Sequence, residues 1–343
     1  AAGREGAAAA PPSSSDPPPS DAFGADAAEA RPGSEVADPR AAPPWGSAAS
    51  PHEGRAPLLR GAALDQAVAQ YAAAAGSSVM GQGVAAPYSP PALSDSKAVE
   101  VLVYCFALMT LNTTEETLIR AQYSAGESLF ACDGWDVFSS EVVPLSHGVA
   151  PEHTKAIGSM HCEFGGPWDL ALNTDVFLKA WRRVIAERRY AHFGWTVKVD
   201  PDCVWLPSRF RSVVEYVDSS LVFYFNNCNE GLHGPVEVLT KGAMLRLSSG
   251  LEATCAHSDF LTAEKAQFGE DVFLRHCLQL LHVNAVNNFD LLSEANCFSR
   301  DPRRDGCISG TVAFHPFKEP HSYFECLAQA RYAESLNATR NAL

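Results

Sequence analysis

The stretch Trp195-Thr-Val-Lys-Val-Asp-Pro-Asp-Cys-Val-Trp-Leu-Pro207 decides how this chain folds and what it binds. Its first residues alternate as a β-strand does, and Pro201 ends the strand because proline cannot donate a hydrogen bond to a sheet. Asp200 and Asp202 are two residues apart, a spacing that places both side chains on one side of an extended chain. We therefore expect two neighbouring carboxylates at the carboxyl end of a strand, where open α/β sheets bind ligands.

Two carboxylates this close repel each other, by roughly 1 kcal/mol in water and about 4 kcal/mol at an effective dielectric constant of about 20. A bound divalent cation reverses this repulsion, so the pair Asp200 and Asp202 predicts a metal site. A simple turn is the alternative interpretation, because Asp-Pro-Asp is also a favoured turn sequence.

Helical and extended patterns alternate around this stretch. Val99–Met109 and Trp195–Val199 have the composition of buried strands, Thr113–Gly126 that of a capped helix, and the segment from Asn173 that of an amphipathic helix. Further extended segments are expected at Leu129–Ser140, Leu221–Phe225 and Val236–Leu239, and further helices at Ser208–Val217, Phe268–His282 and Ser322–Leu336. This order predicts an α/β fold with a mostly parallel central sheet flanked by helices.

The chain divides into two regions of different composition. Residues 1–96 hold 14 of the 23 prolines and no cysteine, and alanine is their commonest residue. They contain too few large apolar side chains to offset the entropy cost of ordering, so we expect a disordered Ala/Pro-rich stalk or linker over 1–96. Residues 97–343 suffice for one domain with a buried core. The net charge of −14 argues against nucleic-acid binding through counterion release.

Cysteine usage bears on the compartment. All 10 cysteines lie between Cys105 and Cys326, and none forms the Cys-x-x-Cys pair of a zinc site. We expect disulfides, whose pairing the sequence leaves open, and the Asn-x-Thr sequences at Asn112 and Asn337 agree with a glycoprotein of the secretory pathway. Ten thiols in a reducing compartment are the alternative.

No apolar run is long enough for a membrane span. The chain begins at Ala1 rather than Met, and a membrane anchor upstream of it is compatible with this sequence.

A second acidic pair, Glu270-Asp271, follows Phe268-Gly269 and opens a helical pattern. Acids in a first helical turn stabilise the helix dipole by about 0.3–1 kcal/mol, which explains the pair without catalysis. A carboxylate at a helix start beside the sheet edge is also placed to take a proton from a hydroxyl nucleophile.

Two later motifs each allow a structural and a functional interpretation. His315, in Val312-Ala-Phe-His-Pro-Phe-Lys318, is either a hydrogen-bonded core histidine or an imidazole ligand, which together with two carboxylates suits Mn²⁺ better than Ca²⁺. Gly234, in Gly231-Leu-His-Gly-Pro-Val-Glu-Val-Leu-Thr240, either belongs to an ordinary loop or lets the backbone approach a bound ligand.

In this order, the motifs resemble the GT-A fold of glycosyltransferases, and within it the fringe-like and β-1,3-galactosyltransferase-like group. Trp195-Thr-Val-Lys-Val-Asp-Pro-Asp202 is similar to the family's strand ending in Asp-x-Asp. Gly234-Pro-Val-Glu-Val-Leu-Thr240 resembles its acceptor-side strand, Glu270-Asp271-Val272 its Glu-Asp-Val motif, and Phe314-His315-Pro316 its late histidine. The likeness runs from about Val99 to the final expected helix, and it implies a GT-A-like domain over residues 97–343. The family usually has three consecutive acids where this chain has Asp-Pro-Asp.

The resemblance implies a metal-dependent, inverting hexosyltransferase-like enzyme of the Golgi lumen with type II topology. Asp202 and His315 would bind Mn²⁺, or Mg²⁺, and Asp200 would contact the ribose or a water on the metal. Thr110 and Gly234 would contact the donor, a UDP-sugar, and Asp271 would be the general base that deprotonates a glycan or glycoprotein acceptor. The metal would offset the charge that builds on the departing diphosphate.

Two alternatives belong to other classes. Haloacid-dehalogenase-like phosphatases also place Asp-x-Asp after a hydrophobic strand, which would make Asp200 a nucleophile and Asp202 an acid. In those enzymes, however, the motif opens the domain and Thr follows the second Asp by two positions, where this chain has Val204. The other alternative is a GT-A-like module that binds a glycan or partner without turnover.

Overall fold

The computed structural model describes residues 100–148, 150–166, 170–264, 267–297 and 301–341. The expected stalk, 1–96, lies outside the described residues. The strands are β1 (Val103–Leu108), β2 (Gly134–Ser139), β3 (Lys155–Ala156), β4 (Phe164–Gly165), β5 (Leu170–Ala171), β6 (Trp195–Val199), β7 (Val204–Trp205), β8 (Phe223–Asn226), β9 (Val236–Thr240), β10 (Asn284–Asn287), β11 (Leu292–Ser293) and β12 (Ala313–Phe314). The α-helices are α2 (Thr114–Ala125), α3 (Thr174–Glu187), α4 (Pro207–Val214), α5 (Lys241–Gly250), α6 (Asp259–Glu264), α7 (Glu270–Leu280), α8 (Pro302–Asp305) and α9 (Pro320–Asn341). Short helical turns are η1 (Ser128–Ala131), η2 (Arg189–His192) and η3 (Leu251–Cys255).

The central sheet has the strand order β10-β8-β9-β6-β1-β2-β3. Pairing is parallel except at β9, which runs antiparallel to both β6 and β8. The predicted mostly parallel α/β sheet is therefore confirmed. Because β1 and β6 are parallel neighbours, their carboxyl ends lie at one edge of the sheet, with Thr110 beyond one strand and Asp200 beyond the other.

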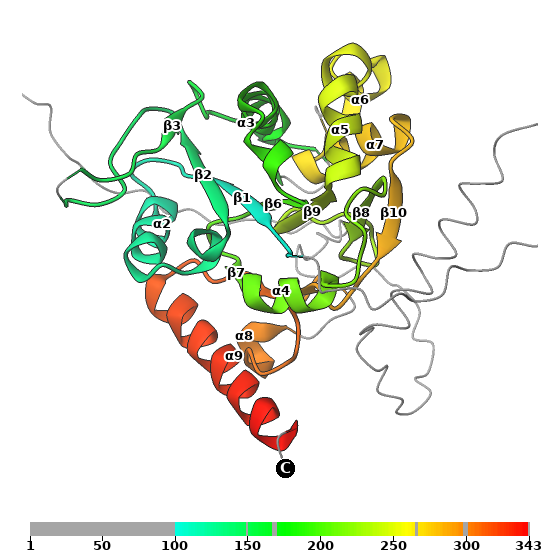
Figure 1. Cartoon of the computed structure of the whole chain (residues 1–343). Coiled ribbons are helices and arrows are strands. Elements are labelled where there is room, and N and C mark those ends of the chain that lie inside the picture. The colour runs from blue at the N-terminus through cyan, green and yellow to red at the C-terminus, as the bar shows by residue number, and fades with distance from the viewer. Residues whose placement is uncertain (1–99, 149, 167–169, 265–266, 298–300, 342–343) are drawn as a thin grey trace, which may run out of the picture. The chain divides into compact units, whose positions relative to one another are not determined.

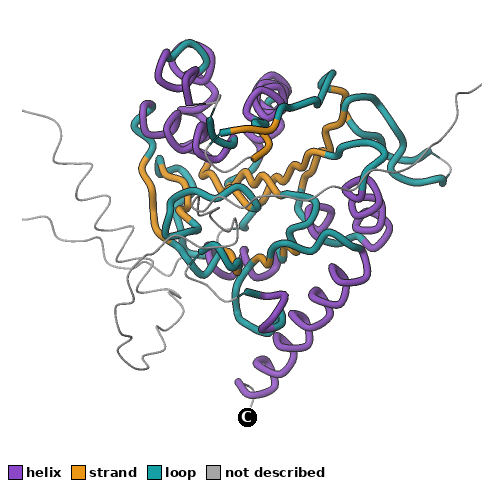
Figure 2. Tube along the Cα trace, turned by 180° about the vertical axis from the view of Figure 1, so that it is seen from behind, coloured by secondary structure: helices purple, strands orange, loops and turns teal. Residues whose placement is uncertain are grey.

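Alternating side chains divide the core into two layers, one on each face of the sheet. In β1, Val103, Cys105 and Ala107 join one buried cluster, and Tyr104 and Phe106 join the other. Helices α3, α5 and α7 cover the second face, whereas α4 covers the first. Figures 1 and 2 show these helices on opposite sides of the strands.

The start of α2 is built to face the sheet edge. The Thr113 side chain caps the helix by accepting from the Glu115 backbone N–H, and Gly126 ends it in the left-handed conformation at φ 67°. The segment expected to be extended from Leu129 begins instead with η1. This turn buries Leu129 and brings Cys132 to Cys105, so the strand starts only at Gly134.

Four disulfides join Cys105 to Cys132, Cys228 to Cys297, Cys255 to Cys277, and Cys307 to Cys326. The expectation of disulfides is confirmed for these eight residues, whereas Cys162 and Cys203 are free thiols. Cys203 is buried within the core cluster on one face of the sheet.

A second sheet, β11-β12-β7, carries the late histidine motif. Phe314 and Val204, which pair across β12 and β7, pack with α9 through Tyr323, whose hydroxyl donates to the Cys203 carbonyl at 3.2 Å. This packing fixes His315 next to the loop after β6. Among the described residues, none of the helices has the length and apolar character that crossing a membrane requires.

Candidate metal and catalytic site

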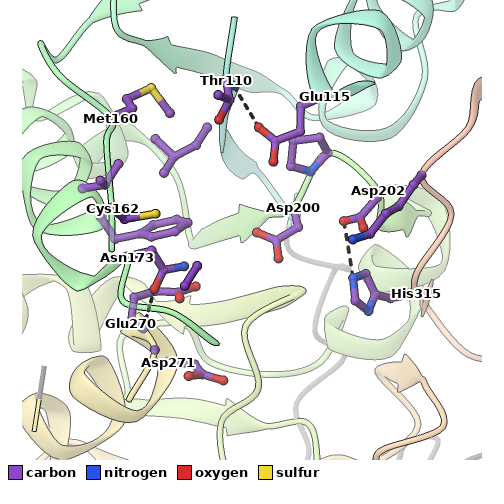
Figure 3. A pocket seen from close by; sticks show the side chains of 17 residues that line it. Thr110, Glu115, Met160, Cys162, Asn173, Asp200, Asp202, Glu270, Asp271 and His315 are labelled. Atoms are coloured by element: carbon purple, nitrogen blue, oxygen red, sulfur yellow. Dashed lines mark hydrogen bonds and ion pairs between the residues drawn. The ribbon is translucent and has the colours of Figure 1, made fainter. Parts of the chain in front are cut away.

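A cavity of 480 Å³ opens at the carboxyl ends of β1 and β6, beside the first turns of α3 and α7. Five of the predicted site residues line it: Thr110, Asp200, Asp202, Asp271 and His315. Figure 3 shows Asp202 and His315 on one side of this space and Met160, Cys162 and Asn173 on the opposite side. Residues as far apart in sequence as Thr110 and His315 thus meet at one edge of the sheet.

Asp200 and Asp202 lie in a turn rather than in the extended chain that we expected. The Cys203 N–H donates to the Asp200 carbonyl at 3.0 Å, because the restricted φ of Pro201 suits the second position of a turn. The turn nevertheless brings the carboxylates of Asp200 and Asp202 close together. One ligand atom from each of Asp200, Asp202 and His315 lies within 4.8 Å of the other two.

His315 contacts a carboxylate on each side of its ring. Its Nε2 lies 3.3 Å from Asp202 Oδ1, and its Nδ1 lies 3.2 Å from Glu294 Oε1. The Asp202 carbonyl also accepts from the Phe317 N–H at 2.8 Å, which ties the turn to the histidine loop. A histidine that ligates a metal normally directs its other nitrogen to such a carboxylate, so this arrangement suits a ligating His315.

Lys198 is the cation beneath the site. It is fully buried, and its Nζ lies 2.7 Å from both Asp200 Oδ1 and Glu270 Oε1 and donates to the Gly234 carbonyl at 2.7 Å. Burial lowers the pKa of Lys198, but Asp200, Glu270 and Glu237 outweigh burial and raise this pKa above its ordinary value. One oxygen of Asp200 is thereby engaged, and the Asp-x-Asp turn is joined to the start of α7.

Asp271 lies in the first turn of α7. Its Oδ1 accepts from the Val272 N–H at 2.8 Å, its Oδ2 from the Gly234 N–H at 3.2 Å, and His233 Nδ1 lies 3.5 Å from Oδ2. Burial alone would raise the pKa of Asp271, but the hydrogen bond and charge of His233 hold this pKa below its usual value. Asp271 is therefore a charged carboxylate at the cavity wall.

Gly234 and Thr110 act through their backbones. Gly234 is not among the residues that line the cavity; it holds Asp271 and Lys198 instead, and an added Cβ would approach Glu270 Oε1 to 3.1 Å. Thr110 lines the cavity and donates its N–H to Glu115 Oε2 at 2.8 Å. Burial raises the pKa of Glu115, and the nearby Asp200 and Asp202 raise it further.

The charges that line the cavity fit a divalent cation. The lining carboxylates are Glu115, Asp200, Asp202, Glu270 and Asp271, and the lining cationic side chain is Lys318, with His315 titratable. Two carboxylates and one imidazole make an oxygen and nitrogen donor set that suits Mn²⁺ better than Ca²⁺. The residues present therefore fit the metal that the sequence predicted.

Lys198, His233 and Glu294 were not among the predicted site residues. Lys198 shares the two-residue spacing of Asp200 and Asp202, and a lysine at an alternating position of a buried strand is the signal that identifies it. His233 and Glu294 lie in loops 61 positions apart in sequence. No local pattern links those two, since only the fold brings them together.

The buried ion pairs of Lys198 predict a large stability effect. Lys198→Met leaves Asp200 and Glu270 without their cation, so we expect the free energy of unfolding to fall by about 3–5 kcal/mol. Chemical denaturation measures this loss. The control is Arg182→Met, whose ion pair with Glu252 lies at the surface with 47% and 56% of the two side chains exposed, and we expect a loss of at most about 1 kcal/mol. Equal losses in the two variants would contradict a buried charge centre at Lys198.

No family model and no curated protein matches this chain. Among solved structures, the chain is similar to the crystal structure of a glycosyltransferase involved in the glycosylation of the major capsid of PBCV-1. The match covers 62% of this chain and 92% of that chain, with 10% sequence identity and a TM-score of 0.39. At this level of similarity, the activity of that protein does not transfer to this chain.

Proposed function

We propose that this protein is a metal-dependent, inverting glycosyltransferase that moves a sugar from a nucleotide-diphosphate donor to a glycan hydroxyl. One observation carries the proposal. The candidate cation ligands Asp200, Asp202 and His315 line the same cavity as a separate charged carboxylate, Asp271. Glycosyl transfer of this type needs both a site for the leaving diphosphate and a base for the attacking hydroxyl.

Asp202 and His315 would hold Mn²⁺, or Mg²⁺ in its place, and the cation supplies charge neutralisation for the leaving diphosphate. Asp200, with one oxygen engaged by Lys198, keeps the other for the donor ribose or the same cation. The cavity volume of 480 Å³ lies within the range of about 300–1,000 Å³ that small-molecule sites occupy. A UDP-sugar is the proposed donor.

Asp271 would act as the general base. The acceptor hydroxyl oxygen bonds to the anomeric carbon of the sugar, the bond from that carbon to the diphosphate oxygen breaks, and the hydroxyl proton passes to an Asp271 oxygen. The nucleotide diphosphate leaves with the electron pair. Attack from the side opposite the leaving group inverts the anomeric configuration. The depressed pKa of Asp271 keeps its carboxyl group in the ionised form that a general base requires.

We further propose that the protein works in the secretory pathway, in the Golgi lumen. Four disulfides in the described part of the chain support an oxidising compartment. The first sequon residue, Asn112, is exposed just before α2 and so is accessible to glycan attachment, whereas the side chain of Asn337 lies outside the described residues.

Donor hydrolysis tests the proposal and separates it from its alternatives. The purified chain is incubated with UDP-galactose, UDP-glucose or UDP-N-acetylglucosamine, with Mn²⁺ or with a chelator, and released UDP is measured. We expect UDP release with Mn²⁺ from at least one donor and none with the chelator. Hydrolysis of a simple aryl phosphate would favour the phosphatase alternative. Binding of Mn²⁺ and UDP without turnover of any donor or acceptor would favour the non-enzymatic module.

A further inference from the structure

Glu294 lies between the candidate cation site and the candidate base. Its Oε1 is 3.2 Å from His315 Nδ1, and its Oε2 is 2.8 Å from His233 Nε2. His315 faces Asp202 with its other nitrogen, and His233 faces Asp271. The five side chains thus form one continuous series of contacts in the order Asp202, His315, Glu294, His233, Asp271.

The backbone around Glu294 and His233 holds this series in place. Glu294 directly follows β11, and the Ser293 carbonyl accepts from the His315 N–H at 3.1 Å. In the loop before β9, the Asn227 side chain accepts from the His233 N–H at 2.8 Å and donates to the His233 carbonyl at 2.9 Å. These hydrogen bonds hold both loops against neighbouring strands, so the backbone positions of His233 and His315 are fixed.

A disulfide joins the two loops. Cys228 and Cys297 are bonded, and the Cys297 N–H donates to the Glu294 carbonyl at 3.2 Å. The Cys297 sulfur also lies within 4.8 Å of one ligand atom of His233 and one of Glu294. Because its sulfur is committed to the disulfide, these three residues support a positioning role rather than a second cation site.

The carboxylate of Glu294 is well suited to hold both rings. Only 7% of its side chain is exposed, against 28% for His233 and 16% for His315. With one oxygen against each ring, the Glu294 carboxylate sets which nitrogen of each ring faces the cavity.

We infer that Glu294 is a positioning residue that fixes His315 toward the cation and, through His233, fixes Asp271 toward the acceptor. The cation site and the base are then held at one set distance by a shared buried carboxylate. This inference rests on the proposed function. It assigns roles to Glu294 and His233 that differ in a measurable way, because Glu294 contacts the candidate cation ligand His315 directly, whereas His233 contacts Glu294 and the candidate base Asp271.

The test compares Glu294→Gln and His233→Gln in the full chain, measuring the Mn²⁺ dissociation constant in the presence of UDP, and kcat and KM for the donor at saturating Mn²⁺. For Glu294→Gln we expect the Mn²⁺ dissociation constant to rise by about 10–100-fold and kcat to fall by about 10-fold or more. For His233→Gln we expect an unchanged Mn²⁺ dissociation constant and donor KM, with kcat lowered by about 10-fold. Glu294→Asp retains the carboxylate and should recover part of the Mn²⁺ affinity.

The control is Asp136→Asn, which removes a buried carboxylate that contacts Tyr104 and Lys155 outside the cavity. It should leave the Mn²⁺ affinity and kcat of the folded protein at wild-type values. Wild-type Mn²⁺ affinity in Glu294→Gln, or wild-type kcat in His233→Gln, would overturn this inference and leave the proposed function standing. If Glu294→Gln does not fold, His233→Gln still tests the inference, because the His233 side chain is partly exposed and its substitution should disturb folding less. A wild-type protein that binds no Mn²⁺ with UDP would instead overturn the proposed function, and the inference with it.

Discussion

The Asp271→Asn variant should bind Mn²⁺ and UDP as the wild type does and lose sugar transfer by about 10²–10⁴-fold, the contribution that a general base makes. The amide keeps the size of the carboxyl group but cannot accept the proton of the attacking hydroxyl. Its oxygen can still accept from Gly234 or Val272, so the start of α7 should stay in place. Initial transfer rates at saturating donor, together with UDP binding by calorimetry, measure the two effects separately.

Asp175→Asn is the matched control, because Asp175 is an exposed acid in the first turn of a different helix, α3. If Asp271 served only the helix dipole, both variants would lose about 0.3–1 kcal/mol of stability and retain transfer. Wild-type transfer by Asp271→Asn would therefore remove Asp271 from the role of base.

Asp202→Asn should abolish the metal-dependent part of nucleotide binding. Asp202 is the carboxylate that faces His315 Nε2, and an amide oxygen without charge neither neutralises a dication nor repels its neighbour Asp200. Because removing even an outer-shell partner of a metal costs about 10–100-fold in affinity, losing a direct ligand should weaken Mn²⁺ binding by at least about 10²-fold. The ratio of UDP affinities with and without Mn²⁺ measures the effect, and it should fall to about one.

Asp218→Asn controls for the turn itself. Like Asp200, Asp218 begins a turn in which its carbonyl accepts from the residue three positions later, but it lies outside the cavity. It should keep the wild-type response of UDP binding to Mn²⁺. An Asp202→Asn variant with that same full response would place the cation elsewhere.

Much of the fold could be predicted from the sequence because its signals are local. The cap at Thr113 and the left-handed Gly126 define α2, and the alternation in Trp195–Val199 defines β6. The reversed direction of β9 has no such signal, since a short buried strand has the same composition whether it pairs parallel or antiparallel. The η1 turn was also missed, because tertiary packing of Leu129 and a disulfide to Cys105 determine it.

The candidate site divides in the same way. Spacing was sufficient to bring Asp200 and Asp202 together, although the backbone that achieves this is a turn. Partners distant in sequence required the fold. The ion pair of Lys198 with Glu270 crosses 72 positions, and Glu294 reaches two histidines on different loops. Contacts of this kind depend on strand order and loop packing, which motif spacing does not encode.

The most direct test of the central claim is the location of manganese in crystals grown with Mn²⁺ and UDP, measured by anomalous X-ray scattering. The account predicts one strong anomalous peak within coordinating distance of Asp202 and His315 Nε2, with the diphosphate of UDP beside it and Asp271 facing the space next to the nucleotide. A manganese peak away from both residues, or UDP bound in the cavity with no metal between its diphosphate and Asp202, would contradict it.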